Sequence, residues 1–156
     1  MNTSHIYPGA HTLNADITIK GCNDAIEFYK KAFGATERGR ILMPDGSIAH
    51  AEIEIKGSLP MMAEEKPSLT NKSPTTLGGT PLILALYVKD DNTVFKQAMD
   101  AGAMQVRLII DEFYGDRVGH VIDPFGYVWM IVTHKEDMSF EEMQKRADKM
   151  FGEIKI

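Results

Sequence analysis

The side chains with the most versatile chemistry are two histidines and a carboxylate. His50 and Glu52 stand two positions apart, so on a β-strand both would project from the same face. An imidazole titrates near neutral pH and can act as an acid, a base or a metal ligand. Together with His120, the pair could hold a divalent ion with open coordination positions. A polar row facing a cleft or solvent is the alternative, with Ala49 and Gly119 allowing close packing.

The segment that leads to His120 adds further candidates. Phe113 and Tyr114 could stack on an aromatic ligand or close the edge of the domain. Arg117, which follows Asp116, could bind a carboxylate or phosphate group through two guanidinium nitrogens. We favour the other interpretation of these two charges, a structural pair that fixes the loop.

The elements that must position these residues form two similar halves, each a strand, a helix and three strands. Apolar residues at helical spacing indicate one helix that Asn23 caps and Gly34 ends, and a second that Asp90 or Asp91 caps and Gly102 ends. In the first half we expect strands over residues 12–19, 36–43, 48–55 and 58–63, and a helix over 24–33. In the second half we expect a buried apolar strand over 82–88, a helix ending at 101, and strands over 105–110, 117–122 and 127–133.

Turn signals and internal similarity support this division. Asp45-Gly46 and Asp123-Pro124-Phe125-Gly126 are typical of hairpin turns. GSIAH resembles GDRVGH with one inserted residue, which makes His50 equivalent to His120; Met61 and Met130 are likewise equivalent. We therefore predict an α+β fold: two tandem βαβββ modules, residues 11–65 and 82–134, forming a curled mixed sheet around a cleft.

Two segments lie outside the modules. Residues 66–81 are rich in Pro, Ser, Thr and Gly, which predicts a plain connection and, less favoured, a substrate lid. Residues 139–151 predict a C-terminal helix with Ser139 and Glu142 as a capping box. Its apolar stripe of Met143, Ala147, Met150 and Phe151 would pack on the domain or on a second subunit.

Composition narrows the class of protein. The 156 residues are 44% hydrophobic and 25% charged, which suits a single globular domain. Cys22 is the only cysteine, which excludes an intramolecular disulfide and favours a reducing, cytoplasmic location. The net charge of -5 and the lack of a basic, aromatic-rich run argue against nucleic acid. The longest apolar run is far shorter than a membrane helix, so we expect no membrane partner.

The chain resembles the vicinal-oxygen-chelate superfamily, the fold of glyoxalases, bleomycin-resistance proteins and extradiol dioxygenases. The resemblance covers nearly the whole chain and rests on AIEFYKKAFGA, PDGSIAHAEI and YGDRVGHVIDPFGYVWMIVTHKED, followed by SFEEMQKRA. The closest likeness is to the branch described as demethylubiquinone-methyltransferase-like or phosphonate-operon glyoxalase-like. Resemblance implies a homodimer, because many members complete their clefts across a subunit interface.

The resemblance also implies where a metal would bind. Family enzymes usually hold one divalent ion between strands of the two modules, and the matching positions here are Asn14, Met62 or Met61, Ile83 and Met130. None is a histidine or a carboxylate, so we expect no cofactor; Asp16 and Glu64 are the nearby residues that could offer an oxygen. The prediction is a metal-independent small-molecule-binding protein. Its cleft would be lined by Asn14, His50, Glu52, Met62, Tyr114, His120 and Met130. The alternative is a lyase, isomerase or dioxygenase with one divalent metal ion on His50, Glu52 and His120.

Overall fold

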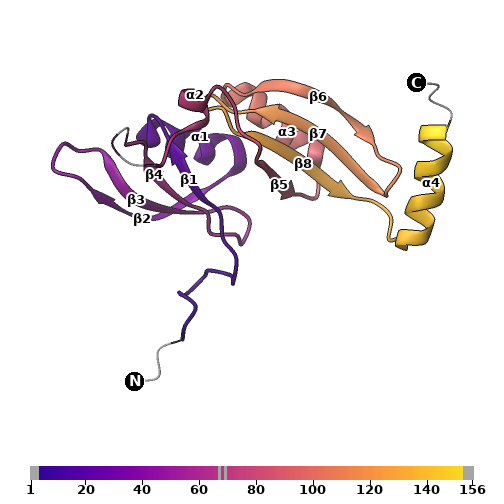
Figure 1. Cartoon of the computed structure of the whole chain (residues 1–156), viewed down its shortest axis with the longest axis horizontal. Coiled ribbons are helices and arrows are strands. Elements are labelled where there is room, and N and C mark those ends of the chain that lie inside the picture. Colours follow the sequence, from indigo (N-terminus) through magenta and orange to yellow (C-terminus); the bar gives the residue numbers. More distant parts are fainter. Residues whose placement is uncertain (1–3, 67, 69, 153–156) are drawn as a thin grey trace.

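The computed structural model describes residues 4–66, 68 and 70–152, and it has two four-stranded sheets side by side (Figure 1). The first module comprises β1 (Asp16–Ile19), α1 (Cys22–Phe33), β2 (Thr36–Leu42), β3 (Ile48–Glu54) and β4 (Met61–Glu64). The second comprises β5 (Ile83–Tyr87), α3 (Asp91–Ala101), β6 (Met104–Asp111), β7 (Asp116–Ile122) and β8 (Val128–His134). The strand orders are β1-β4-β3-β2 and β5-β8-β7-β6, with β1/β4 and β5/β8 parallel. The predicted α+β architecture of two βαβββ units is confirmed.

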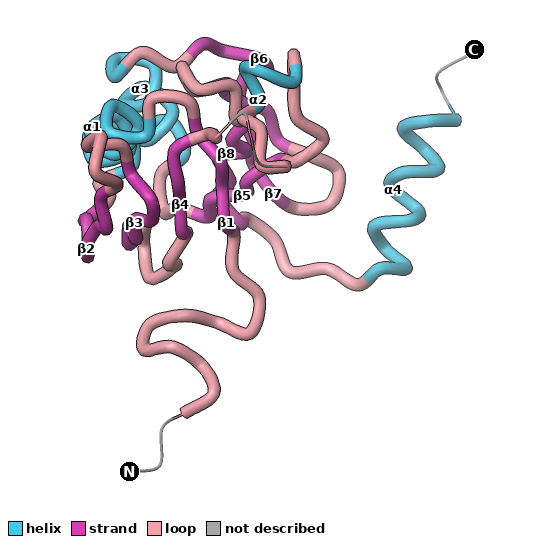
Figure 2. Tube along the Cα trace, turned by 60° about the vertical axis from the view of Figure 1, so that its left-hand side comes forward, coloured by secondary structure: helices cyan, strands magenta, loops and turns pink. Residues whose placement is uncertain are grey.

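One apolar core joins the two modules. Helices α1 and α3 pack against each other (Figure 2), and buried side chains from both modules form a single cluster. The Trp129 ring of β8 lies 4.4 Å from the Phe33 ring and 5.4 Å from the Tyr29 ring of α1. We call the sheet faces that these helices leave uncovered the open faces.

The start of α1 differs from the sequence prediction. The helix begins at Cys22, and its first backbone N–H groups are bound by the Glu64 carboxylate, which accepts hydrogen bonds from Gly21 N (2.8 Å) and Cys22 N (2.7 Å). The prediction that Asn23 is the cap was therefore wrong. A carboxylate from a distant strand replaces the local cap, and it lies where it also favours the positive end of the helix dipole.

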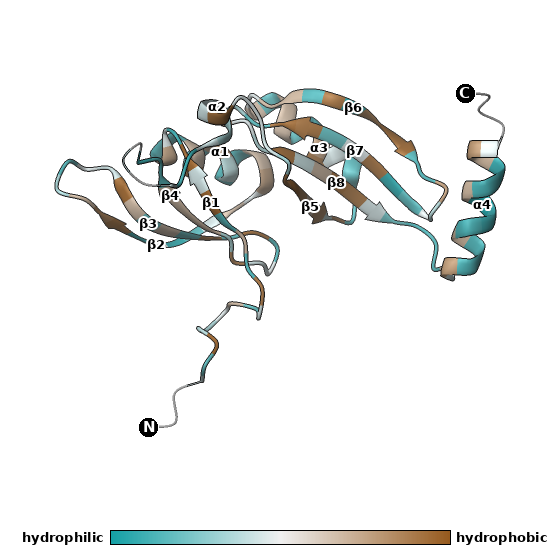
Figure 3. Ribbon diagram, in the orientation of Figure 1, coloured by the Kyte–Doolittle hydropathy of each residue, from teal (hydrophilic) through white to brown (hydrophobic). Residues whose placement is uncertain are grey.

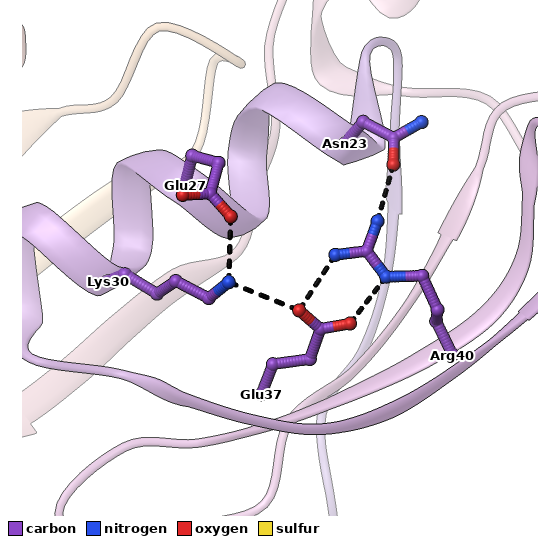
Figure 4. A network of polar contacts seen from close by, with 5 residues as sticks. All are labelled: Asn23, Glu27, Lys30, Glu37 and Arg40. Atoms are coloured by element: carbon purple, nitrogen blue, oxygen red, sulfur yellow. Dashed lines mark hydrogen bonds and ion pairs between the residues drawn. The ribbon is translucent and has the colours of Figure 1, made fainter.

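Asn23 instead belongs to a polar network that attaches β2 to α1 (Figure 4). Its side-chain oxygen accepts a hydrogen bond of 2.6 Å from Arg40, and Arg40 also binds Glu37. Lys30 lies between Glu27 (2.7 Å) and Glu37 (3.2 Å). These charged side chains therefore bind one another and hold β2 against α1. Because Arg40 is engaged in this way, it is not a strong candidate for binding a ligand.

The strand predicted over residues 82–88 forms, but it is not buried. Ile83 is 52% exposed and Tyr87 is 58% exposed, whereas Leu86 on the other face is 7% exposed. Because β5 is an edge strand and α3 covers only one face of its sheet, the continuous apolar run has one buried and one uncovered side.

The segments outside the modules also differ from expectation. The connection contains a short helix, α2 (Pro74–Leu77), which the sequence reasoning missed; Ser73 caps it, and residues 67 and 69 of this connection lie outside the described residues. Helix α4 (Phe140–Gly152) begins after Ser139 as predicted, but none of its residues is buried. It stands at the far end of the second sheet (Figure 1), so its apolar stripe does not pack into the core of its own domain.

Candidate functional site

His50 and Glu52 lie together on the open face of β3. His50 Nε2 is 3.5 Å from Glu52 Oε1, and the Glu52 side chain is 16% exposed. On the other side of Glu52, Arg38 Nη1 lies 4.0 Å from Oε2. Both distances are long for charge-assisted hydrogen bonds, so the carboxylate keeps unused capacity as an acceptor.

The N-terminal segment holds Arg38 in place. The guanidinium donates a 2.8 Å hydrogen bond to the carbonyl oxygen of Pro8 and lies 5.7 Å from the centre of the Tyr7 ring. Arg38 is therefore shared between Glu52, a backbone carbonyl and an aromatic face. Sequence reasoning missed Tyr7 and Arg38, because no local pattern links residues 7 and 8 to β2.

Two cavities meet at Glu52. One, of about 310 Å³, is lined by Tyr7, Arg38, Gly39, Arg40, Ile41, His50 and Glu52. The other, of about 510 Å³, lies against residues 5–14 and is lined also by Glu52, Leu59 and Met61. Asn14 borders this second cavity, where its side-chain amide is hydrogen-bonded to the backbone N–H (2.9 Å) and carbonyl (2.6 Å) of His11. The structure thus brings together three of the predicted cleft residues, Asn14, His50 and Glu52.

The methionine of this face is Met61 and not Met62. Met62 is fully buried in the core, while Met61 is half-buried and lines the larger cavity. The alternation of side chains along β4 places these neighbours on opposite faces. In the strand register Met61 lies between Asp16 of β1 and Glu52 of β3, so the open face carries the row Asp16, Met61, Glu52.

The corresponding row of the second module is Ala85, Met130, His120 and Arg107. Since Met130 pairs with His120 as Met61 pairs with Glu52, the structural counterpart of His120 is Glu52. The predicted equivalence of His50 and His120 was wrong. The sequence comparison placed the inserted residue in the second module, but the structure has the extra residue in the first. Leu42 pairs with Ile48 and Ile41 with His50, which leaves Ala49 as a β-bulge in β3.

His120 and Tyr114 lie in a partly buried polar cluster on this second sheet. The His120 Nδ1 atom is buried with no hydrogen-bond partner among the described residues. Burial and the charge of Arg107 lower the pKa of His120. Burial and the nearby Glu112 carboxylate raise the pKa of Tyr114. Both groups are therefore held in their neutral forms near neutral pH.

Asp116 and Arg117 do not form the predicted structural pair, because neighbouring strand residues face opposite ways. Arg117 turns toward α3, with Nε 3.4 Å from Asp91 Oδ2. Asp116 faces the open side, 2.6 Å from His134 Nδ1, and accepts a 3.2 Å hydrogen bond from Tyr87. The hydrogen bond with Asp116, and after it the one with Asp137, raise the pKa of His134.

The predicted cleft residues thus fall into two groups, one on each sheet. His50 and Glu52 belong to the first sheet, and Tyr114, His120 and Met130 belong to the second module. In the part of the chain that the structure describes, no three His, Cys, Asp or Glu side chains gather as a metal site would need. The set His50, Glu52 and His120 is not assembled within one chain.

The residues at the metal positions that the resemblance implies also do not fit a hard divalent cation. Asn14 is engaged with His11, Met61 and Met130 offer thioethers, and Ile83 offers no donor atom. Glu64, the nearby carboxylate, is occupied at the start of α1. Asp16 remains as an exposed carboxylate beside Met61.

Comparisons with known proteins agree with the fold. The family model "Glyoxalase At5g48480-like, N-terminal domain" matches residues 17–58. The chain is 37% identical over 135 residues to the uncharacterized protein Mb0911c of Mycobacterium bovis, covering 85% of this chain and 89% of that one. It is 32% identical over 128 residues to the uncharacterized protein At5g48480 of Arabidopsis thaliana, covering 78% of this chain and 76% of that one.

Solved structures show the same architecture. The X-ray structure of the Arabidopsis protein superposes with a TM-score of 0.63 at 30% identity, covering 78% of this chain and 97% of that one. A glyoxalase/bleomycin resistance protein/dioxygenase family enzyme from Burkholderia phytofirmans gives a TM-score of 0.63 at 17% identity, covering 78% and 96%. In the described part of the chain, no helix combines the length and apolar character needed to span a membrane. The chain belongs to the glyoxalase/bleomycin-resistance/dioxygenase family, the vicinal-oxygen-chelate superfamily.

Proposed function

We propose that this chain binds a small molecule on the open face of its first module, without the divalent-metal site usual in its family. The observation that carries the proposal is the position of Glu52. Its carboxylate borders two cavities, is mostly buried, and has only long contacts with His50 and Arg38. A mostly buried acceptor with spare capacity at a cavity wall is what a ligand donor needs.

We further propose that the protein acts as a homodimer in the cytoplasm. Its single, buried cysteine suits a reducing compartment. The second sheet supports the dimer, since β5 and β6, its two edge strands, carry many hydrophobic residues (Figure 3). The exposed apolar side chains on these strands are Ile83, Tyr87, Met104, Val106, Leu108 and Ile110. Apolar side chains exposed along the edge strands of a sheet are what a second copy would cover.

A thermal-shift screen against small metabolites tests the binding proposal. A ligand at a hundred times its Kd adds about 2.7 kcal/mol to the free energy of unfolding, which moves Tm by several degrees. The shift should shrink in Glu52→Gln and persist in Glu54→Gln, a matched change on the same strand that lies outside both cavities. A ligand that shifts Glu52→Gln as strongly as the wild type would place binding elsewhere.

A metal-dependent lyase, isomerase or dioxygenase is the second candidate, favoured by the closeness of His50 to Glu52. His120 would have to come from the partner subunit, because the two groups lie on different sheets. Metal analysis of protein purified without chelator distinguishes the candidates. Stoichiometric metal that is lost in His50→Ala would overturn the metal-independent proposal.

A further inference from the structure

A third cavity lies between the two modules, where their sheets meet without hydrogen bonding. It measures about 200 Å³ and is lined by the segment before β1, the β3–β4 turn, β5 and Trp129. It shares His11, Asn14 and Leu59 with the 510 Å³ cavity. That cavity in turn shares Tyr7 and Glu52 with the 310 Å³ cavity. Each cavity therefore adjoins the next, and we call the three together the groove.

The two ends of the groove differ in chemistry. The end between the modules, which we call the seam, is walled mainly by apolar side chains, among them Leu59, Leu84, Leu86 and Trp129. The other end holds Glu52, His50 and Arg38. An apolar wall gains free energy when a ligand displaces water from it, whereas the carboxylate needs a hydrogen-bond donor. A ligand that fills the groove must therefore be apolar at one end and polar at the other.

The charges near Glu52 favour a cationic polar group. Asp16 and Glu52 flank Met61 in the strand register, about 10 Å apart across three strands. Two basic side chains line this end, Arg38 and Arg40, and both have other partners. Arg38 contacts the Pro8 carbonyl and the Tyr7 ring, and Arg40 binds Glu37 and Asn23. Because both guanidinium groups are bound elsewhere, the Glu52 carboxylate keeps unused acceptor capacity, and Asp16 adds a second negative charge nearby. This arrangement attracts an ammonium ion and repels a carboxylate.

We propose that the groove binds an amphipathic amine, with its ammonium group at Glu52 and its apolar tail in the seam beside Trp129. The position of the ammonium group rests on the proposed function, since it uses the same Glu52. The position of the tail rests on the seam alone. The two parts can therefore fail separately.

Trp129 makes the tail directly observable, because it is the only tryptophan of the chain. Its fluorescence is titrated with n-butylamine, n-hexylamine and n-octylamine, and with the alkanols and alkanoates of the same lengths. Affinity should rise about fourfold per added methylene until the seam is full. Amines should bind more tightly than alkanols, and alkanoates most weakly. In Glu52→Gln, the affinity for amines should fall to that for alkanols of the same length, while the dependence of affinity on chain length remains.

Variants that fill the seam locate the tail. Ala85 and Ser58 line it from opposite modules, and both are exposed, so a larger side chain fits the fold at either site. Ala85→Phe and Ser58→Phe should each abolish the chain-length dependence, whereas Ala147→Phe on α4 should preserve it. The tail position is overturned if affinity does not depend on chain length in the wild type. It is also overturned if the chain-length dependence is unchanged in both Ala85→Phe and Ser58→Phe. Equal affinity for amines and alkanols overturns the position of the ammonium group but not the position of the tail in the seam.

Discussion

Asp123 should be the most costly carboxylate to alter, because it binds four donors in the core. It is 3% exposed and accepts hydrogen bonds from Tyr29 Oη (2.7 Å), Trp129 Nε1 (2.9 Å), Phe125 N (2.9 Å) and Tyr127 N (2.9 Å). Tyr29 belongs to the first module and the other donors to the second. The carboxylate therefore connects the two modules as well as fixing the β7–β8 turn.

The expected losses follow from the donors that each substitution leaves without a partner. Asp123→Ala leaves four buried donors without an acceptor, at a cost of about 1–3 kcal/mol each before the structure relaxes. We therefore expect the free energy of unfolding to fall by about 4 kcal/mol. Asp123→Asn keeps the oxygen that binds Phe125 N and Tyr127 N, but its NH₂ group would face the Trp129 N–H. One donor facing another should cost about 2 kcal/mol. Urea unfolding followed by Trp129 fluorescence measures both losses, with the exposed Asp100→Asn as a control expected within about 0.5 kcal/mol.

The pH dependence gives a sharper test. Burial raises the pKa of Asp123 above its usual range, against the opposing effect of hydrogen bonds from Trp129 and Tyr29. A raised folded pKa means that the folded protein holds this proton more tightly than the unfolded chain does. At neutral pH the buried, ionised carboxylate thus lowers the free energy of unfolding. This destabilisation disappears as the pH falls through the folded pKa toward about 4. The stability gap between wild type and Asp123→Asn should widen on acidification; a gap that narrows would refute the reasoning.

Three further predictions concern other contacts. Glu64→Ala should cost about 1 kcal/mol by exposing the start of α1, with a smaller loss in Glu64→Gln, which keeps one acceptor; far-UV circular dichroism during urea unfolding measures both. Gly119→Ala should cost about 1–3 kcal/mol in the same assay, because its Cβ would lie 2.8 Å from the Phe95 ring; an unchanged midpoint would contradict this contact. Hydrogen bonds from Arg40 and Lys30 lower the pKa of Glu37 to about 2, so stability present above pH 4.5 should be lost as the pH falls toward 2. In Glu37→Gln this loss of stability at low pH should be smaller. An identical loss in this variant would exclude the contacts of Glu37 with Arg40 and Lys30 as its cause.

Local sequence patterns predicted most of the fold. Helical spacing located α1 and α3, Gly34 and Gly102 ended them in left-handed conformations, and the Asp123 to Gly126 turn formed as expected. These features depend on residues close together in the chain. The Glu64 cap of α1 could not be predicted in this way, because it forms between residues more than 40 positions apart.

The site was harder to predict for the same reason. Alternation correctly placed His50 and Glu52 on one face, but register decides which residues become neighbours across strands. The bulge puts an extra residue, Ala49, in the first module, whereas the sequence comparison placed the inserted residue in the second. Together these two differences change the counterpart of His120 from His50 to Glu52. Tyr7 and Pro8 reach the site from an irregular segment that has no periodicity to interpret.

The two modules share a fold but differ on their open faces. Toward the helices both present aliphatic residues, such as Ile17 in β1 and Leu86 in β5. On the open side, the row of the first module has carboxylates on both sides of Met61, whereas Met130 lies between Ala85 and His120. Because packing constrains only the covered face, the open faces were free to take different roles. The first module's acidic row beside cavities suits ligand binding, and the second module's exposed apolar strands suit contact with a second copy.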